Sequence, residues 1–216
     1  MTLSVTLLFE SDPSAHVSAV MPAGVAKVEL APVDRAALDA AAAGAWYWPE
    51  ASESLAKVQG ALRLHASPEL SPRMALLALT RAAASLSVSL DPSAVLSEPV
   101  GLAFAAEAWR EQSVDISPED LPVLLWVAFV GTEREADRDL MTRGLAELAL
   151  PEVEILQSKR GGEEVLEILM DLALVVLTTE ATIEDGTVIE VSGGPIRVRR
   201  MPSARGSGAS TLRARV

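Results

Sequence analysis

Strand-like and helix-like patterns alternate along this 216-residue chain, and that alternation limits the folds it can adopt. Residues 55–66 carry the clearest strand signal, because apolar and polar side chains occupy alternate positions there. The alternate positions that carry apolar side chains predict one buried face of the strand. The positions between them predict a second, polar face, which carries Lys57, Gln59, Arg63 and His65.

The other elements follow from apolar periodicity, capping residues and turn residues. Asp34 and Ser71 are suited to the N-cap position of a helix, and Thr132 to Glu135 matches a capping box. Helices are predicted over residues 34–44, 71–87, 101–112, 132–148 and 163–178. Strands are predicted over residues 4–9, 26–30, 121–130, 152–156, 187–191 and 196–200, with a turn at 192–195 joining the last two.

From Leu121 onward the predicted order is β-α-β-α-β-β. The short connections and the mixed order favour an α+β fold over a doubly wound parallel one. We therefore expect a mixed, largely antiparallel sheet with helices packed on it, in a single domain over residues 1–200. Two related halves, 1–115 and 116–200, are a possible subdivision, and residues 201–216 are expected to form a basic, partly flexible tail.

The residue inventory removes several classes of catalytic site. The chain has no Cys and no Asn, a single Tyr at position 47, and only two His, at positions 16 and 65. Cysteine nucleophiles, disulfides and cysteine-ligated metals are therefore excluded. Neither His has an acid at the spacing of a zinc ligand, so we expect no metal, no cofactor and no catalytic residue.

The formal net charge of −12 is unevenly distributed. From Arg197 onward there are six Arg and no acid, whereas the preceding residues carry 12 basic and 30 acidic side chains, a net −18. Such an acidic body disfavours nucleic-acid binding, which needs Lys and Arg on the phosphates. The basic end is interpreted as a last strand with a loosely attached end. Alternatively, it binds an acidic partner or the protein's own acidic face.

The apolar segments are short. The N-terminal apolar run has no preceding positive charge and ends at Glu10, so it predicts a first strand and not a signal peptide. The runs at 121–130 and 172–177 fall short of the roughly 20 residues that span a bilayer. We therefore expect a cytoplasmic protein that does not insert into membranes.

Several short motifs lie in the C-terminal half. They are Leu125-Trp126, Thr142 to Leu145, Glu154 and Asp185-Gly186. On these motifs the chain resembles the bacterial domain-of-unknown-function family 4261 over roughly 70 to 150 residues. Thr187 to Glu190 departs from the family pattern, which has an Asp-Thr-Ile-Gly-like run there. The resemblance implies a related fold and no particular mechanism.

Candidate binding residues come from two kinds of signal. Trp46 and Trp48 flank Tyr47 beside Pro49, and rigid aromatics near a loop are typical of interfaces, although they also cap cores. In an extended segment the two Trp would point to one side. Arg63, His65 and Glu154 are candidates for a polar cleft. The family motifs and the helix-interrupting glycine add Trp126, Thr142, Gly144 and Asp185.

Two functions fit these observations. The first is a non-enzymatic binding or adaptor protein of bacterial type, which engages a protein partner through aromatic and acidic surface. The second is a small-molecule-binding protein or an unusual enzyme that uses a polar cleft around His65. The poor catalytic inventory favours the first.

Overall fold

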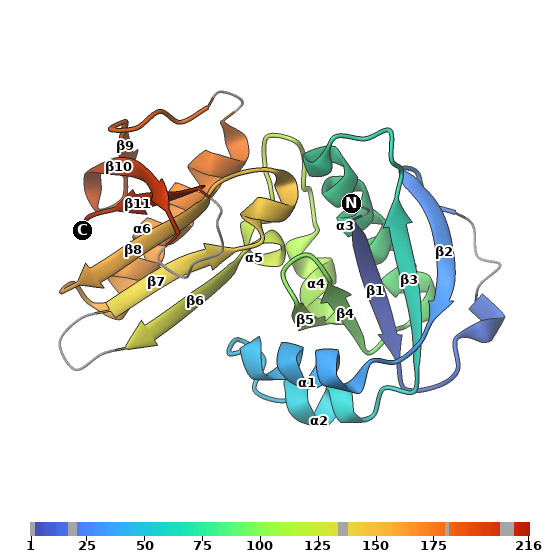
Figure 1. Cartoon of the computed structure of the whole chain (residues 1–216). Coiled ribbons are helices and arrows are strands. Elements are labelled where there is room, and N and C mark those ends of the chain that lie inside the picture. The colour runs from blue at the N-terminus through green and yellow to red at the C-terminus, as the bar shows by residue number, and fades with distance from the viewer. Residues whose placement is uncertain (1–2, 17–20, 134–137, 180–181, 204–209) are drawn as a thin grey trace. The chain divides into compact units, whose positions relative to one another are not determined.

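The computed structural model describes residues 3–16, 21–133, 138–179, 182–203 and 210–216 (Figure 1). The chain divides into two compact units, Met1–Trp126 and Val127–Val216. Each unit combines a mostly antiparallel sheet with helices, which confirms the α+β class. The division falls after Trp126, later than the subdivision considered at residue 115, and the second unit includes the end of the chain.

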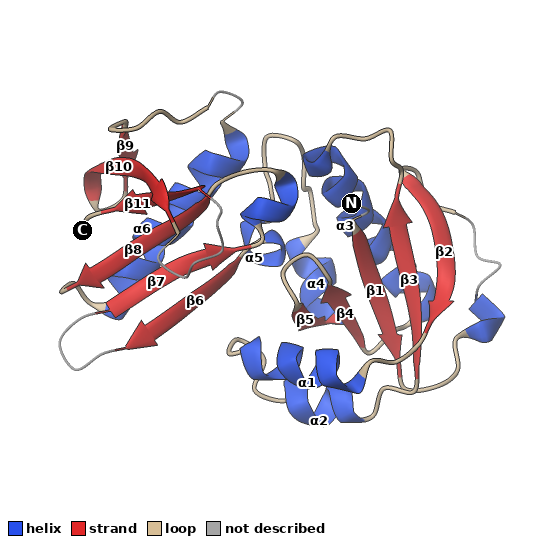
Figure 2. Ribbon diagram, in the orientation of Figure 1, coloured by secondary structure: helices blue, strands red, loops and turns tan. Residues whose placement is uncertain are grey.

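The first unit is built on a five-stranded sheet in the order β2-β3-β1-β4-β5, in which every neighbouring pair is antiparallel. Figure 2 shows the strands of both units in red. The strands are β1 (Ser4–Phe9), β2 (Val25–Ala31), β3 (Gly60–Ala66), β4 (Ala94–Ser97) and β5 (Leu102–Ala105).

Helices cover both faces of this sheet. The helical elements are η1 (Ser14–His16), α1 (Arg35–Gly44), α2 (Ala51–Ala56), α3 (Pro72–Leu90), α4 (Ala106–Gln112) and α5 (Val123–Trp126). Helix α3 packs against β1 and β3, and α4 packs against α3. On the other face α1 and α2 form a core cluster with the sheet, which includes Leu38 and Leu55 of the helices and Leu8 and Ala61 of the strands.

The predicted caps of α1 and α3 are confirmed. The Asp34 side chain accepts a hydrogen bond from the Ala37 N–H at 3.1 Å, and Ser71 Oγ accepts one from Met74 N–H at 3.5 Å. Each cap satisfies an N–H that has no partner within the first turn of the helix. Pro72 follows Ser71 at the start of α3, where its missing N–H costs nothing.

Helix α3 is the one helix among the described residues that is long and apolar enough to cross a membrane. Half of its most apolar window is buried inside the protein, where the helix packs on the sheet. A helix in the core of a folded protein can have the same length and apolar composition as a membrane-spanning helix.

The second unit holds a six-stranded sheet in the order β6-β7-β8-β11-β10-β9. Its strands are β6 (Ala128–Glu133), β7 (Arg138–Arg143), β8 (Glu152–Ser158), β9 (Val188–Val191), β10 (Gly194–Pro202) and β11 (Ser210–Ala214). Strands β8 and β11 are parallel, and the other described pairs are antiparallel. Helix α6 (Gly162–Thr178) packs on β7, β8 and β9, and η2 (Leu145–Leu148) precedes β8.

The helix predicted over residues 132–148 is wrong. Residues 128–133 and 138–143 form the antiparallel strands β6 and β7, and residues 145–148 form the 3-10 turn η2. Part of the capping box lies outside the described residues. The local composition favours a helix, but pairing of β7 with strands on both sides overrides a propensity of tenths of a kcal/mol per residue.

Three further boundaries needed correction. Residues 51–56 form helix α2, so the predicted strand 55–66 begins only at Gly60. The predicted helix 101–112 begins as strand β5, because β4 and β5 pair as a hairpin. The predicted strand 121–130 starts with the helical turn α5, and its strand part begins at Ala128. In each case the secondary structure of the segment depends on a long-range pairing or packing contact, which a short apolar run does not reveal.

The basic tail expected over residues 201–216 is corrected in part, because residues 204–209 lie outside the described residues. Residues 210–214 form β11, which lies between β8 and β10 and pairs with both. Leu212 and Ala214 are buried in the unit's core. Residues 210–214 therefore belong to the sheet and are not a loosely attached extension.

Candidate functional site

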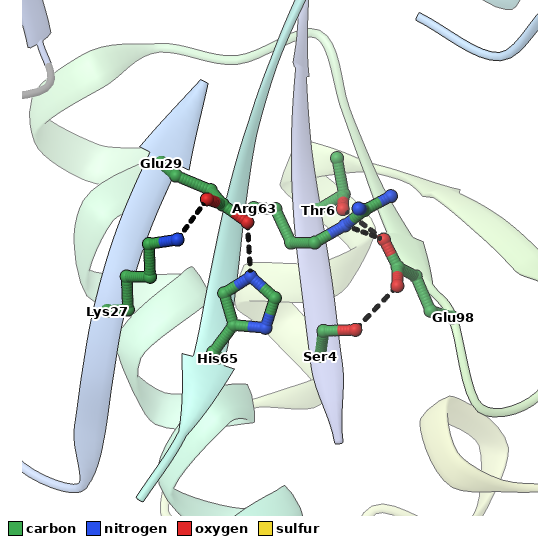
Figure 3. Close-up of polar contacts among 7 residues, drawn as sticks. All are labelled: Ser4, Thr6, Lys27, Glu29, Arg63, His65 and Glu98. Carbon is green, nitrogen blue, oxygen red and sulfur yellow. Dashed lines mark hydrogen bonds and ion pairs between the residues drawn. The ribbon is translucent and has the colours of Figure 1, made fainter. Parts of the chain in front are cut away.

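One face of the first sheet changes from apolar to polar along its strands. On β1 the side chains of this face are Leu8, Thr6 and Ser4, and on β3 the register places Ala61, Arg63 and His65 opposite them. Helices α1 and α2 cover the apolar end. The rest forms what we call the polar half-face: Ser4, Thr6, Lys27, Glu29, Arg63, His65 and Glu98 (Figure 3).

Glu98, which directly follows β4, is the hydrogen-bond acceptor on one side of the polar half-face. Its carboxylate accepts hydrogen bonds from Thr6 Oγ1 at 2.6 Å, from Arg63 Nε at 2.7 Å and from Ser4 Oγ. Burial raises the pKa of Glu98, but the two hydroxyls and the Arg63 guanidinium together outweigh it, so the pKa lies below its usual value. The charged carboxylate is therefore the favoured form.

Glu29 on β2 contacts the basic residues on the other side of the polar half-face. It forms an ion pair with Lys27, and its Oε1 lies 2.7 Å from His65 Nε2. The bond from Lys27, and then the contact with His65, lower the pKa of Glu29. Figure 3 shows the two carboxylates on either side of the Arg63 and His65 side chains. Each acid of the half-face thus has a cationic or imidazole partner on the same face.

A pocket of about 270 Å³ adjoins this cluster where the polar and apolar parts of the face meet. Its polar lining includes Thr6, Asp34, Arg63 and Glu98. Its apolar lining includes Leu8, Leu38 and Leu96. Arg63 lines this pocket, but His65, around which a polar cleft was expected, is not among the lining residues.

We predict that Glu98→Gln makes the stability of the first unit less dependent on pH. Because the folded pKa of Glu98 is depressed, its contribution is present above the unfolded value of about 4.3 and is lost as pH falls through the folded pKa. Urea unfolding at pH 7 and at about pH 3, below the unfolded value, followed by Trp fluorescence, measures this. Equal losses of stability on acidification in both proteins would contradict the prediction.

Four aromatic side chains contact one another in a row that runs from the surface into the core. Trp46 is 68% exposed, and its ring meets the Tyr47 ring edge to face at 5.7 Å. Tyr47 stacks on Phe104 at 5.0 Å, and Phe104 meets the buried Trp109 edge to face at 5.6 Å. The Tyr47 hydroxyl donates to the Ala103 carbonyl at 2.9 Å, and burial raises its pKa. Trp46 is therefore held on a fixed aromatic base.

Trp46 and Trp48 do not share a side as an extended segment predicted. Residues 46–47 and 49–50 form turns between α1 and α2. Trp48 is half-buried and packs on the core cluster of α1, α2 and the sheet, whereas Trp46 faces solvent. The pair thus divides into one core residue and one surface residue.

Trp126 is a core residue of the first unit. Its side chain is fully buried, and its indole N–H donates to Thr80 Oγ1 at 2.9 Å. Trp109 donates to the carbonyl of the same Thr80 at 3.2 Å. This buried Thr on α3 thus receives both indoles, which gives Trp126 a structural place in the fold.

Thr142 and Gly144 belong to a local network around Glu152. Glu152 accepts hydrogen bonds from Thr142 Oγ1 at 2.6 Å and from the backbone N–H groups of Gly144 and Ala146 at 2.8 and 3.0 Å. Gly144 has φ of 121°, a conformation that other residues rarely adopt. The network fixes the turn between β7 and β8.

Glu154 and Asp185 are both engaged within the second unit. The Glu154 side chain is 1% exposed and receives hydrogen bonds from Arg213 Nη2 at 3.0 Å and Ser203 Oγ at 2.8 Å. Asp185 Oδ1 accepts from the Arg200 N–H at 2.9 Å, at the predicted Asp185-Gly186 turn. Arg63 and His65 lie in the first unit and Glu154 in the second.

Comparisons with known proteins recognise the part of the chain that runs from β7 to β11, which includes η2, β8, α6, β9 and β10. Residues 141–213 match the model of the domain of unknown function DUF4261. This confirms the resemblance in the C-terminal half; the Leu125-Trp126 pair precedes the matched range. No curated protein and no solved structure matches the chain.

Sequence reasoning missed the acids that organise the polar half-face. Glu29 lies opposite Arg63 in the β2–β3 register, and Glu98 lies beyond β4, a strand that was not predicted. The alternation of Lys27 and Glu29 on β2 was a signal for the first. In the part of the chain that the structure describes, no group of three His, Asp or Glu is placed to hold a metal ion.

Proposed function

We propose that this protein is a non-enzymatic binding protein that engages a protein partner through the surface around Trp46. The observation that carries the proposal is the exposure of this large aromatic side chain, 68% of which is open to solvent. Tryptophan is among the residues that contribute most to protein interfaces when a partner buries it.

The base under Trp46 supports the same proposal. Tyr47 stacks on Phe104, and its hydroxyl is bound to the Ala103 carbonyl, so the segment that carries Trp46 is anchored to β5. A side chain that is already ordered loses little entropy when it binds. Trp46 is therefore suited to act as a preformed anchor.

The charge arrangement of the polar half-face favours binding over acid–base catalysis. Glu98 is held ionised by Arg63 and two hydroxyls, and the pKa of Glu29 is likewise lowered. A general acid or base at neutral pH needs a pKa near 7, which calls for a carboxyl whose pKa is raised. Both acids of the half-face are shifted in the opposite direction.

Replacing Trp46 by alanine should abolish capture of the partner. Loss of a central interface Trp costs about 2 kcal/mol or more, which corresponds to roughly 30-fold weaker binding. Quantitative mass spectrometry of proteins purified from the native host with the wild type and with Trp46→Ala measures this. Val88→Ala is the matched control, because Val88 is an exposed apolar residue on α3, 75% open to solvent.

The second candidate function is small-molecule binding at the pocket lined by Thr6, Arg63 and Glu98. Its size and mixed lining suit a small polar ligand that a guanidinium and a hydroxyl can bind. This alternative would replace the first if Trp46→Ala retained every partner while a metabolite stabilised the wild type and not Arg63→Ala.

A further inference from the structure

Four arginines gather on one face of the second sheet. On β10, Arg197 and Arg199 alternate with the buried Ile196 and Val198. At the end of the chain Arg213 and Arg215 alternate with the buried Ala214. Because side chains of a strand alternate between faces, the arginines lie on the face opposite Ile196, Val198 and Ala214. Together with Met201 they line a groove of about 480 Å³, which we call the arginine groove.

The register brings like charges together. Arg199 lies directly opposite Arg213 in the antiparallel β10–β11 pair. Like charges at such positions disfavour folding, so this arrangement is unfavourable for the isolated sheet. The chain as a whole has net charge −12, so acids are abundant elsewhere.

Internal partners neutralise only part of this charge. Glu154 pairs with Arg213, and Arg197 Nη1 donates to the Gly186 carbonyl, which is uncharged. Arg199 and Arg215 are exposed and form no ion pair with any residue that the structure describes. Arg213 Nε is buried and has no hydrogen-bond acceptor. Among the described residues, the groove thus contains two arginines without an ion pair and one guanidinium nitrogen without an acceptor.

We propose that the arginine groove binds an acidic segment of a partner protein. Guanidinium groups form paired hydrogen bonds with carboxylates, and neighbouring side chains on adjacent strands can bind successive acids of an extended peptide. A peptide is favoured over a nucleic acid because the first 196 residues carry a net −18, which repels a long polyanion. Met201 adds an adaptable apolar contact in the groove.

The test is fluorescence anisotropy with the full-length protein and a labelled peptide of eight residues that alternates Glu and Ser. We expect the wild type to bind it and to lose affinity as salt rises, because salt screens exposed charges. A peptide with Gln in place of Glu should not bind. Arg199→Gln with Arg215→Gln should bind the acidic peptide at least about tenfold more weakly.

The control variant is Arg143→Gln with Lys159→Gln, which removes two exposed cations of the same unit outside the groove. It should bind as the wild type does. The groove variant should melt at the same temperature as the wild type or higher, since removing Arg199 relieves its repulsion with Arg213. This readout separates lost binding from lost folding.

Equal affinity of the groove variant and the control variant would overturn the proposal. So would tighter binding of a single-stranded DNA oligonucleotide, of phosphatidylserine vesicles or of inorganic phosphate than of the acidic peptide. The assay uses no natural partner and leaves Trp46 intact, so its outcome is independent of the function proposed for the first unit.

Discussion

Trp126→Ala is expected to unfold the first unit at urea concentrations at which the wild type remains folded. The side chain is fully buried, so its removal leaves a large cavity, and truncations of this kind cost about 3–5 kcal/mol. The change also removes the indole donor to Thr80. All four Trp of the chain lie in the first unit, so Trp fluorescence in urea reports its unfolding directly.

Trp46→Ala is the matched control, because it removes the same side chain from an exposed position. Its effect on the free energy of unfolding should stay within about 0.5 kcal/mol, as for most surface substitutions. Trp126→Phe should fall between the two variants, since it keeps most of the apolar volume but loses the hydrogen bond. If Trp126→Ala and Trp46→Ala unfolded at the same urea concentration, the assignment of Trp126 to the core would be contradicted.

Glu154→Ala is expected to destabilise the second unit by about 3 kcal/mol, because it leaves the mostly buried Arg213 without its carboxylate. Hydrogen exchange of peptides from β8 and β11 measures the loss. These are the parallel strands that carry the two residues, at positions paired in the register. Their amides should exchange faster, whereas those of the first unit should not change.

Two further variants separate the buried pair from a general effect of charge. Glu164, near the start of α6, forms a surface ion pair with Arg160, which precedes the helix, so Glu164→Ala should cost less than about 1 kcal/mol. Arg213→Gln combined with Glu154→Gln should be less destabilising than the sum of its single changes, because no unpaired charge stays buried. A cost of Glu154→Ala no larger than that of Glu164→Ala would refute the structural role of the pair.

Elements with strong local signals were predictable from the sequence. The caps at Asp34 and Ser71 form as expected, because capping depends on residues that are three positions apart in the chain. Strands β1, β8 and β9, helix α6 and the Asp185-Gly186 turn were also predicted correctly. These signals act over a few residues, so the local sequence pattern is sufficient to predict these elements.

Elements that depend on distant partners were not predictable in the same way. Residues 138–143 have a composition that favours a helix, and pairing with β6 and β8 makes them a strand. Residues 210–214 are rich in polar and basic side chains, and they form β11 only because β8 and β10 leave a position between them. Chain order does not reveal such a parallel insertion.

The candidate site was predictable only in part. The polar parity of Arg63 and His65 on one strand was evident, but the carboxylates that bind them come from β2 and from the residue after β4. The exposure of Trp46 and the packing of Trp48 could not be distinguished, because the segment between α1 and α2 has no regular alternation of apolar and polar residues. Register and side-chain packing decide these features.

The most direct test of the proposed function is photo-crosslinking in the native host from position 46. The amino acid p-benzoylphenylalanine is placed at Trp46 in one variant and at the exposed Val88 in another. The proposed function predicts a discrete crosslinked protein from position 46 that is absent from position 88 and is competed away by excess wild type. The same crosslinks from both positions, or none from position 46, would contradict it.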